Sequence, residues 1–367
     1  MSAAVKPDAA SGPLTGIRVV EFGGIGPGPY CGQLLAEMGA EVLVIDREGG
    51  NGWSNPVTDH GKARLALDIR SDEGRSQALD LIALADVLIE GFRPGVMERL
   101  GLGPDVALDR NARLVYGRMT GWGQTGPLAQ SAGHDLNYIA VTRALAGIGR
   151  AGEPSVPPLN LIGDFGGGSL FLALGIACAL VERGTSGQGQ VIDAAIVDGV
   201  ASMMSFFSGL QKTGSIRMER DRNLLAGAAP FYRCYECSDG KQVAVGALEP
   251  QFFRQLVEKI GAPAEWLKDQ NDPTTWPERS AAMAAIFLTK SRAEWCDLLE
   301  GTDACFAGVL DLEESELSPH LLARQTIVEI DGVKRPAPAP RFSRTPGSVP
   351  AAKSSDELIK SWQRGSI

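Results

Sequence analysis

Two polar residues are candidates for moving a proton, His134 and Asp164. The chain has three histidines, and His134 lies in GHDLNY, shortly after the Gly-rich segment TGWGQTGP. Histidine is the side chain whose ordinary pKa is nearest neutrality, so it is suited to take up and release protons. A lone histidine is usually structural or superficial, so the place of His134 in the fold decides between the two interpretations.

Asp164 lies in LNLIGDFGGGS, between an apolar run and three glycines. The apolar sequence from Ser169 onward predicts a buried helix, which places Asp164 near a helix start. A helix start presents unpaired N–H groups, and glycines let a ligand approach the backbone closely. We therefore expect the N–H groups around Gly166 and Gly167 to stabilise an anionic oxygen, whereas the simpler role of Asp164 is that of a helix cap.

Glu249 is a third acidic candidate. It lies in VGALEPQFF, between a predicted strand and a proline that would begin the next helix. Its simplest role is to cap that helix. The functional alternative is an acid that orients or polarises His134, and the sequence alone does not bring these two residues together.

Basic residues also gather near the ends of the predicted strands. They are Arg47, Lys62, Arg64 and Arg93. Each alone is an ordinary surface charge, but together they offer cations for a phosphorylated ligand. The chain as a whole carries a formal net charge of -9, which disfavours a nucleic-acid partner.

The elements that would position these residues alternate between strand and helix. Buried strands are predicted at 17–22, 41–46, 86–90 and 113–119, and helices at 30–38 and 71–84, the second capped by Ser71. This order predicts an α/β fold with a parallel, doubly wound sheet. Ligands bind beyond the carboxyl ends of such strands, and each predicted strand leads there into a Gly- or Pro-rich loop.

Several other kinds of protein are disfavoured. The GGIGPGP segment does not complete the dinucleotide fingerprint G-x-G-x-x-G, because the last position falls on Pro29 or Cys31. The six cysteines have no framework spacing, and the CxxC of Cys234 and Cys237 lacks the further ligands of a zinc site. The apolar run at 169–181 is too short to span a membrane, and no secretory signal is visible, so we expect a cytoplasmic protein.

A second region begins near residue 225. It contains FYRCYECSDGKQVAVG, which predicts a surface hairpin, and helical stretches up to about residue 318. The closing RPAPAPRFSRTP is expected to run extended over the surface. A length of 367 residues agrees with about two domains.

Long segments of the chain resemble the family III coenzyme A transferase superfamily (CaiB/BaiF type), and within it the alpha-methylacyl-CoA racemase branch. The resemblance rests on LTGIRVVEFGGIGPGPY, EVLVIDR, ADVLIEGFRPGVMERLGLG, MTGWGQTGPLAQSAGHDLNYIA, PPLNLIGDFGGGS, GALEPQF and APRFSRTP. It spans nearly the whole chain and is far more specific than any single short motif.

The resemblance implies an interlocked homodimer with a shared active site. Each subunit would have a discontinuous, Rossmann-like large domain that binds coenzyme A, at 1–190 and 330–367. A linker at 191–225 would lead to a smaller α+β domain at 226–318, and a return linker would follow at 319–329. Coenzyme A would be part of the substrate, and no separate cofactor or metal is expected.

The resemblance also implies roles for individual residues. His134 and Asp164 match the paired acid and base of a racemase, and Glu249 would reach the site from the partner subunit. Residues expected to bind substrate or coenzyme A are Ile25, Arg47, Lys62, Arg64, Arg93, Tyr138, Gly166 and Gly167. Lys62 lies in GKA rather than the usual GKR of the family, with Arg64 one place later.

The reaction implied is inversion at the carbon next to a thioester carbonyl. One base removes the α proton to give an enolate, and a second group delivers a proton to the opposite face. The alternative is a coenzyme A transferase, in which the residue matching Asp164 is a covalent nucleophile. Because typical transferases of this family lack the histidine of GHDLNY, His134 favours the racemase.

Overall fold

The computed structural model describes residues 11–50, 52–351 and 353–364. The chain forms two compact units, and each is built from segments that are distant in the sequence. The first unit comprises Met1–Thr142, Pro158–Met203 and Pro319–Ile367, and the second comprises Arg143–Pro157 and Met204–Ser318. We expected 143–157 in the large domain and 191–203 in a linker, whereas these segments group with the second and the first unit, respectively.

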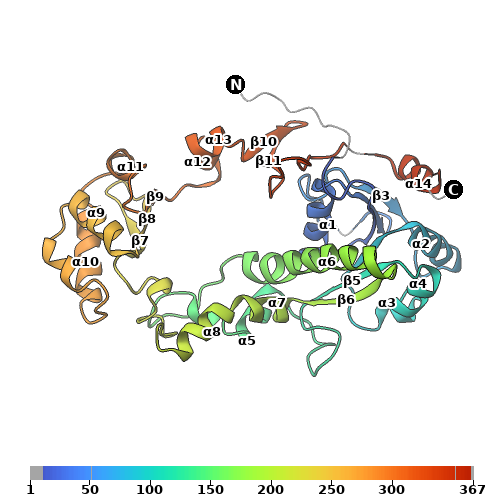
Figure 1. Cartoon of the computed structure of the whole chain (residues 1–367), viewed down its shortest axis with the longest axis horizontal. Coiled ribbons are helices and arrows are strands. Elements are labelled where there is room, and N and C mark those ends of the chain that lie inside the picture. Colours follow the sequence, from blue (N-terminus) through green and yellow to red (C-terminus); the bar gives the residue numbers. More distant parts are fainter. Residues whose placement is uncertain (1–10, 51, 352, 365–367) are drawn as a thin grey trace. The chain divides into compact units, whose positions relative to one another are not determined.

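A six-stranded parallel sheet forms the centre of the first unit (Figure 1). Its strands, in spatial order, are β3 (Ala63–Ala66), β2 (Glu41–Asp46), β1 (Arg18–Phe22), β4 (Val87–Glu90), β5 (Val115–Thr120) and β6 (Gln190–Ala195). The predicted α/β fold with a parallel sheet is confirmed. The two edge strands, β3 and β6, were not predicted, since ARLA and QVIDAA lack the continuous apolar run of a central strand.

Helices cover both faces of this sheet, which explains why its central strands are apolar on both sides. The helices α1 (Pro27–Glu37) and α6 (Leu170–Ser186) contact each other. The helix α2 (Asp72–Leu84) contacts both α4 (Pro104–Arg110) and α14 (Ser355–Arg364). The predicted cap of α2 is confirmed, because the Ser71 hydroxyl accepts a hydrogen bond from the N–H of Gly74 at 3.0 Å.

Three short helices lie at the carboxyl ends of the strands or close to them. They are α3 (Val96–Arg99), α5 (Asp135–Val141) and α7 (Ile196–Met203). A π-helix, η2 (Leu161–Ser169), leads directly into α6 and contacts α1, α5 and α7. Short π-helical stretches are rare and occur often at functional sites.

The continuous helical stretch Leu161–Ser186 is longer than the apolar run that we read from the sequence. Among the described residues it is the one helix with the length and composition to cross a membrane. The predicted burial of this helix is observed on one side only: Leu172 and Ile176 are buried and would contact a Cβ placed on Gly117 of β5, whereas Leu170, Leu174 and Val181 are exposed. The expectation of a run too short to span was wrong, because η2 extends α6 at its start.

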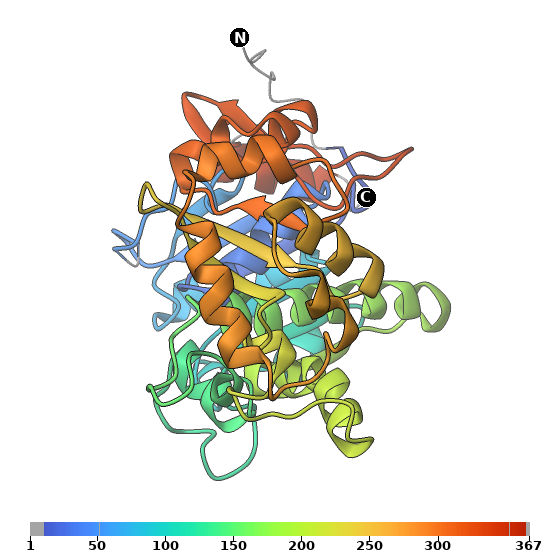
Figure 2. The same ribbon diagram turned by 90° about the vertical axis from the view of Figure 1, so that its left-hand side faces the viewer.

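The second unit has a three-stranded antiparallel sheet. The helices of this unit are drawn in gold and orange in Figure 2. The strands are β7 (Tyr232–Glu236), β8 (Gln242–Gly246) and β9 (Phe306–Gly308), and the helices are α9 (Pro250–Ile260), α10 (Trp276–Phe287) and α11 (Arg292–Leu299). The predicted hairpin is confirmed, with Cys234 exposed and Cys237 buried.

The other short elements complete the chain. In the second unit they are η1 (Leu145–Gly147), α8 (Ser205–Lys212), η3 (Leu224–Ala226), η4 (Ala264–Lys268) and α12 (Leu312–Glu316). In the first unit they are α13 (Pro319–Ala323) and the hairpin of β10 (Ile327–Ile330) and β11 (Val333–Pro336). The proline-rich residues 337–350 that follow β11 form neither helix nor strand.

Candidate active site

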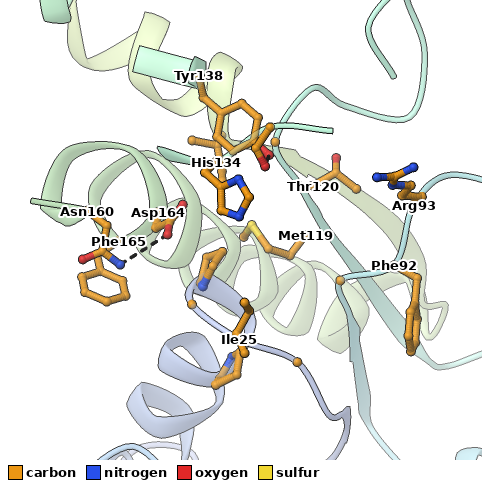
Figure 3. Close-up of a pocket in the computed structure, with 18 of the residues that line it drawn as sticks. Ile25, Phe92, Arg93, Met119, Thr120, His134, Tyr138, Asn160, Asp164 and Phe165 are labelled. Carbon is orange, nitrogen blue, oxygen red and sulfur yellow. Dashed lines mark hydrogen bonds between the residues drawn. The ribbon is translucent and has the colours of Figure 1, made fainter. Parts of the chain in front are cut away.

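A cavity of about 650 Å³ lies in the first unit, beyond the carboxyl ends of the parallel strands. This size is within the range of ligand pockets. The loops after β1, β4 and β5 and the start of η2 line it (Figure 3). Five of the predicted site residues are among the lining: Ile25, Arg93, His134, Tyr138 and Asp164.

His134 occupies the N-cap position of α5, where the loop after β5 turns into that helix. Its backbone N–H donates to Oδ1 of Asn137 at 3.0 Å, which fixes the first turn. The residue is exposed, and its imidazole points into the cavity beside Asp164 in Figure 3. His134 and Asp164, which come from different elements, therefore line the same cavity.

Asp164 lies in the first turn of η2, and its carboxylate is partly withdrawn from water. Burial raises the pKa of this carboxyl above the ordinary aspartate value. The charge of Asp135 raises the pKa further, whereas a hydrogen bond from Asn160 Nδ2 at 3.3 Å and the nearby His134 lower it. A carboxylate in such surroundings is a better proton acceptor than a fully hydrated one.

Asp135 and Asn160 contact Asp164, and neither contact was predicted from the sequence. Asp135 Oδ2 accepts a hydrogen bond from the Asp164 backbone N–H at 2.7 Å. Two weak signals were present in the sequence. Asp135 is adjacent to His134, and Asn160 precedes Asp164 by four residues, the spacing of side-chain neighbours on a helix.

The loop after β1 closes the cavity from the side of α1. The left-handed backbone of Gly26, at φ 73°, brings it so near Asp164 that a Cβ would lie 3.3 Å from Oδ2. The Ser169 hydroxyl is buried and lies 2.8 Å from the Pro27 carbonyl oxygen, to which it donates. The glycine- and proline-rich segment therefore fits closely around the aspartate, which explains its composition better than phosphate binding does.

Apolar side chains form another part of the wall. Tyr138 donates its hydroxyl hydrogen to the Gly133 carbonyl oxygen, and its ring packs edge-on against Trp122 with centroids 4.8 Å apart. Because its hydroxyl is already used, Tyr138 contributes chiefly a ring surface to the cavity. Met119 and Ile196 also line the cavity, so it could hold an apolar group next to the two polar ones.

Lys62 and Arg64 are placed differently from the expected phosphate contacts. The Lys62 side chain is 0% exposed and donates to Glu21 Oε2 at 2.8 Å and to the Pro29 carbonyl oxygen at 2.7 Å. Arg64 bridges Asp46 and Asp59 through ion pairs of 3.1 and 2.7 Å. Neither residue lines the cavity in the described part of the chain, and Lys62 has no exposed ammonium to offer a phosphate.

The glycines after Asp164 are used for helix packing. A Cβ on Gly167 would lie 2.5 Å from Val200 Cγ2, and one on Gly166 would lie 3.0 Å from the Leu161 carbonyl oxygen. Of the residues the structure describes, neither glycine is among those lining the cavity. The Asp164 N–H donates to Asp135 and the Phe165 N–H donates to the Asn160 carbonyl oxygen, so neither of these two donors is free for an oxyanion.

A second cavity of about 490 Å³ lies at the carboxyl ends of β1 and β2. Arg47 lines it together with Phe22 and Phe92, and Phe92 also lines the first cavity. Glu90, at the end of β4, accepts the Phe92 N–H at 2.7 Å and pairs with Arg118 at 2.9 Å. The loop that carries Phe92 is therefore held firmly between the two cavities.

Glu249 belongs to the second unit, where it is exposed at the N-cap of α9. Its backbone carbonyl accepts the N–H groups of Phe252 and Phe253. In the described structure its carboxylate makes no capping hydrogen bond, so the simple capping role that we considered is not observed. No cluster of three or more His, Cys, Asp or Glu that could hold a metal ion occurs among the described residues.

Comparison with known proteins identifies the family. The model of CoA-transferase family III matches residues 14–353. The chain belongs to this family. This family III protein is 46% identical to alpha-methylacyl-CoA racemase of Mus musculus and 42% identical to that of Homo sapiens, each over 93% of this chain and 89% of the relative.

A solved structure gives the same fold. The crystal structure of a CAIB/BAIF family protein from Brucella suis superposes on this family III protein with a TM-score of 0.79 at 25% identity. The match covers 96% of this chain and 99% of that chain. The mixed α/β architecture with its six-stranded parallel sheet is therefore the fold of the family.

Proposed function

We propose that this protein racemises 2-methylacyl-CoA thioesters by proton transfer at the α carbon. The observation that carries the proposal is the placement of His134 and Asp164 in one cavity, in a chain closely similar to proteins named alpha-methylacyl-CoA racemase. Inversion of a carbon needs one proton-transfer group on each face. An exposed imidazole and a carboxyl of raised pKa are two groups of this kind.

The two cavities suggest how the substrate lies. Coenzyme A has a phosphorylated nucleotide at one end and a thiol at the other. The cavity with Arg47, Phe22 and Phe92 offers a cation and aromatic walls for the nucleotide. The thioester would then pass Phe92 and Arg93 into the cavity of His134, where apolar walls receive the acyl chain.

The proton transfer passes through an enolate. One of the two groups removes the α proton, and negative charge gathers on the thioester oxygen. The other group delivers a proton to the opposite face, and the roles exchange in the reverse direction. The N–H groups of Asp135 and Leu136, the first two of α5, have no acceptor within the helix and directly follow His134, so they are our candidates to stabilise the enolate oxygen.

We further propose that the active form is an interlocked homodimer in the cytoplasm, with Glu249 of one subunit completing the site of the other. The carboxylate of Glu249 makes no capping hydrogen bond to its own helix, which supports a role for it elsewhere. A stripe of exposed apolar residues on α6, formed by Leu170, Leu174 and Val181, supports burial against another surface. As in the expectation from sequence, coenzyme A would be part of the substrate rather than a separate cofactor.

The decisive experiment follows the α proton of each enantiomer separately in heavy water. The wild type should exchange and racemise both enantiomers without any added acid. In Asp164→Asn the enantiomer whose proton faces His134 should still exchange, but without inversion, and the other should be inert. In His134→Gln the pattern should reverse, and racemisation should fall on the order of 10²–10⁴-fold in both variants.

Two results would contradict the proposal. One is a wild-type protein that neither exchanges the α proton nor inverts it. The other is turnover that requires a free-acid acceptor and leaves a covalent adduct on Asp164 in mass spectra, which is the signature of a coenzyme A transferase. Loss of exchange without loss of coenzyme A binding in the variants would separate chemistry from binding.

A further inference from the structure

The side chain of Asp135 joins the two elements that carry the proposed catalytic pair. Asp135 is the first residue of α5, directly after His134. Its Oδ2 accepts the backbone N–H of Asp164, in η2, at 2.7 Å. The residue is only 8% exposed, so this hydrogen bond is little weakened by competition from water.

The bond satisfies a donor that the helix itself leaves unpaired. The first N–H groups of any helix lack an acceptor within it. In η2 the Phe165 N–H bonds to the Asn160 carbonyl five residues earlier, and the Asp164 N–H lies one position before that. The carboxylate of Asp135 is therefore an external acceptor for the backbone of the aspartate itself.

The approach of this carboxylate depends on Gly163. A Cβ at Gly163 would lie 2.3 Å from Asp135 Oδ2 and 2.7 Å from its Cγ, which no real contact allows. Gly163 is buried, and its absent side chain leaves the space that Asp135 fills. Two residues distant in sequence are thus matched to make one contact.

We propose that Asp135 is a positioning residue that fixes the spacing between His134 and Asp164. The path from one group to the other is short, because it runs through one peptide bond, one aspartate side chain and one hydrogen bond. Two-sided proton transfer needs both groups near the same carbon atom, and a misplacement of about 1 Å can cost on the order of 10²-fold in rate. This role rests on the proposed racemase function.

Three variants test the role. Asp135→Ala removes the acceptor, Gly163→Ala pushes the carboxylate away, and Asp135→Asn keeps an acceptor oxygen while removing the charge. We expect kcat for racemisation to fall on the order of 10²-fold in the first two, with KM little changed. Asp135→Asn should retain most of the activity. The backbone amides of η2 should exchange hydrogen for deuterium faster in the first two variants than in the third.

A matched control is available at the amino ends of the strands of the same sheet. Asp86 Oδ2 likewise accepts a backbone N–H, that of Arg18 at 3.0 Å, and its other oxygen pairs with Arg183. Asp86→Ala should lower the melting temperature and leave kcat of the folded enzyme unchanged. It thereby separates a general loss of stability from a loss of spacing.

The outcomes distinguish this role from the proposed function. Asp135→Ala with a lowered melting temperature but wild-type kcat overturns the spacing role and leaves the racemase proposal intact. Equal loss in Asp135→Asn and Asp135→Ala, without faster amide exchange in η2, assigns the effect to charge and also overturns it. A wild type that transfers coenzyme A without α-proton exchange overturns both proposals, while amide exchange still shows whether the bond to Asp164 exists.

Discussion

Two acidic residues of the first unit, Glu21 and Asp164, are both withdrawn from water, but their surroundings suit different roles. Those of Glu21 suit a structural role, and those of Asp164 suit proton transfer. Glu21 lies in the middle of the sheet, on β1, and is 1% exposed. Asp164 lies at the sheet's carboxyl edge and lines a cavity. Burial raises the pKa of both carboxyl groups, but their partners differ.

Glu21 has a full opposite charge as its partner. The Lys62 ammonium lies 2.8 Å from Oε2 and opposes the effect of burial on the pKa of Glu21. The pair also reaches the Pro29 carbonyl in α1, so it connects β1, the segment before β3 and the helix. A buried pair of this kind costs much to break and offers nothing to a ligand.

Asp164 has weaker partners. Its carboxylate receives one amide hydrogen bond, from Asn160, and lies near the negative charge of Asp135 and the imidazole of His134. No lysine or arginine pairs with it among the described residues. A carboxylate without a fixed cation can take up and release a proton at lower cost, which is what proton transfer requires.

The largest expected effect comes from breaking the buried pair. Lys62→Met leaves Glu21 buried without a cation, and it should reduce the free energy of unfolding by about 3–5 kcal/mol. Equilibrium urea unfolding measures this. If Lys62 were instead a phosphate contact, the variant would weaken coenzyme A binding and leave the unfolding curve in place.

The double variant Glu21→Gln/Lys62→Met is the control for that prediction. It removes both charges, so much of the lost stability should return, and the cycle of single and double variants gives the coupling between them. A double variant no more stable than Lys62→Met alone would contradict a stabilising role for the pairing itself.

Arg47, which follows the carboxyl end of β2, should affect ligand binding rather than stability. Arg47 is exposed and lines the second cavity, so Arg47→Ala should raise the Kd of coenzyme A on the order of tenfold with little change in unfolding. Isothermal titration measures the binding. Arg75, which pairs with Asp72 on α2 away from both cavities, provides the control, because Arg75→Ala should change neither quantity.

The contrast between Lys62 and Arg47 also shows how far the sequence could lead. Both were expected to bind the ligand because both are cations close to a strand. The central strands, their order of appearance and the helix cap at Ser71 follow from local pattern and were predicted correctly. Whether a lysine points outward or inward depends on a tertiary partner, here Glu21 of a strand 41 residues earlier, and no local pattern contains that information.

The site shows the same limit. His134 and Asp164 could be placed together because a parallel sheet brings its loops to one edge, and the shared cavity agrees with that placement. The triple glycine after Asp164 was misinterpreted. The sequence does not show whether a glycine leaves room for a ligand or for a neighbouring side chain such as Val200. Only the fold distinguishes the two cases. Asp135 was passed over because its contact with Asp164 spans 29 residues.

The smallest expected effect concerns the charge of Asp164 itself. Because its pKa is raised in the folded protein, its contribution to stability is present below the ordinary aspartate pKa of about 3.9 and is lost as pH rises through the folded value. At pH 7 the charged form therefore disfavours folding, and Asp164→Asn should raise the melting temperature by a few degrees at most, on the order of 1 °C. The gain should disappear in melts recorded below about pH 4. A gain that persists unchanged at low pH would assign it to packing, and an Asp164→Asn protein less stable at pH 7 would place Asp164 with Glu21 as a structural carboxylate.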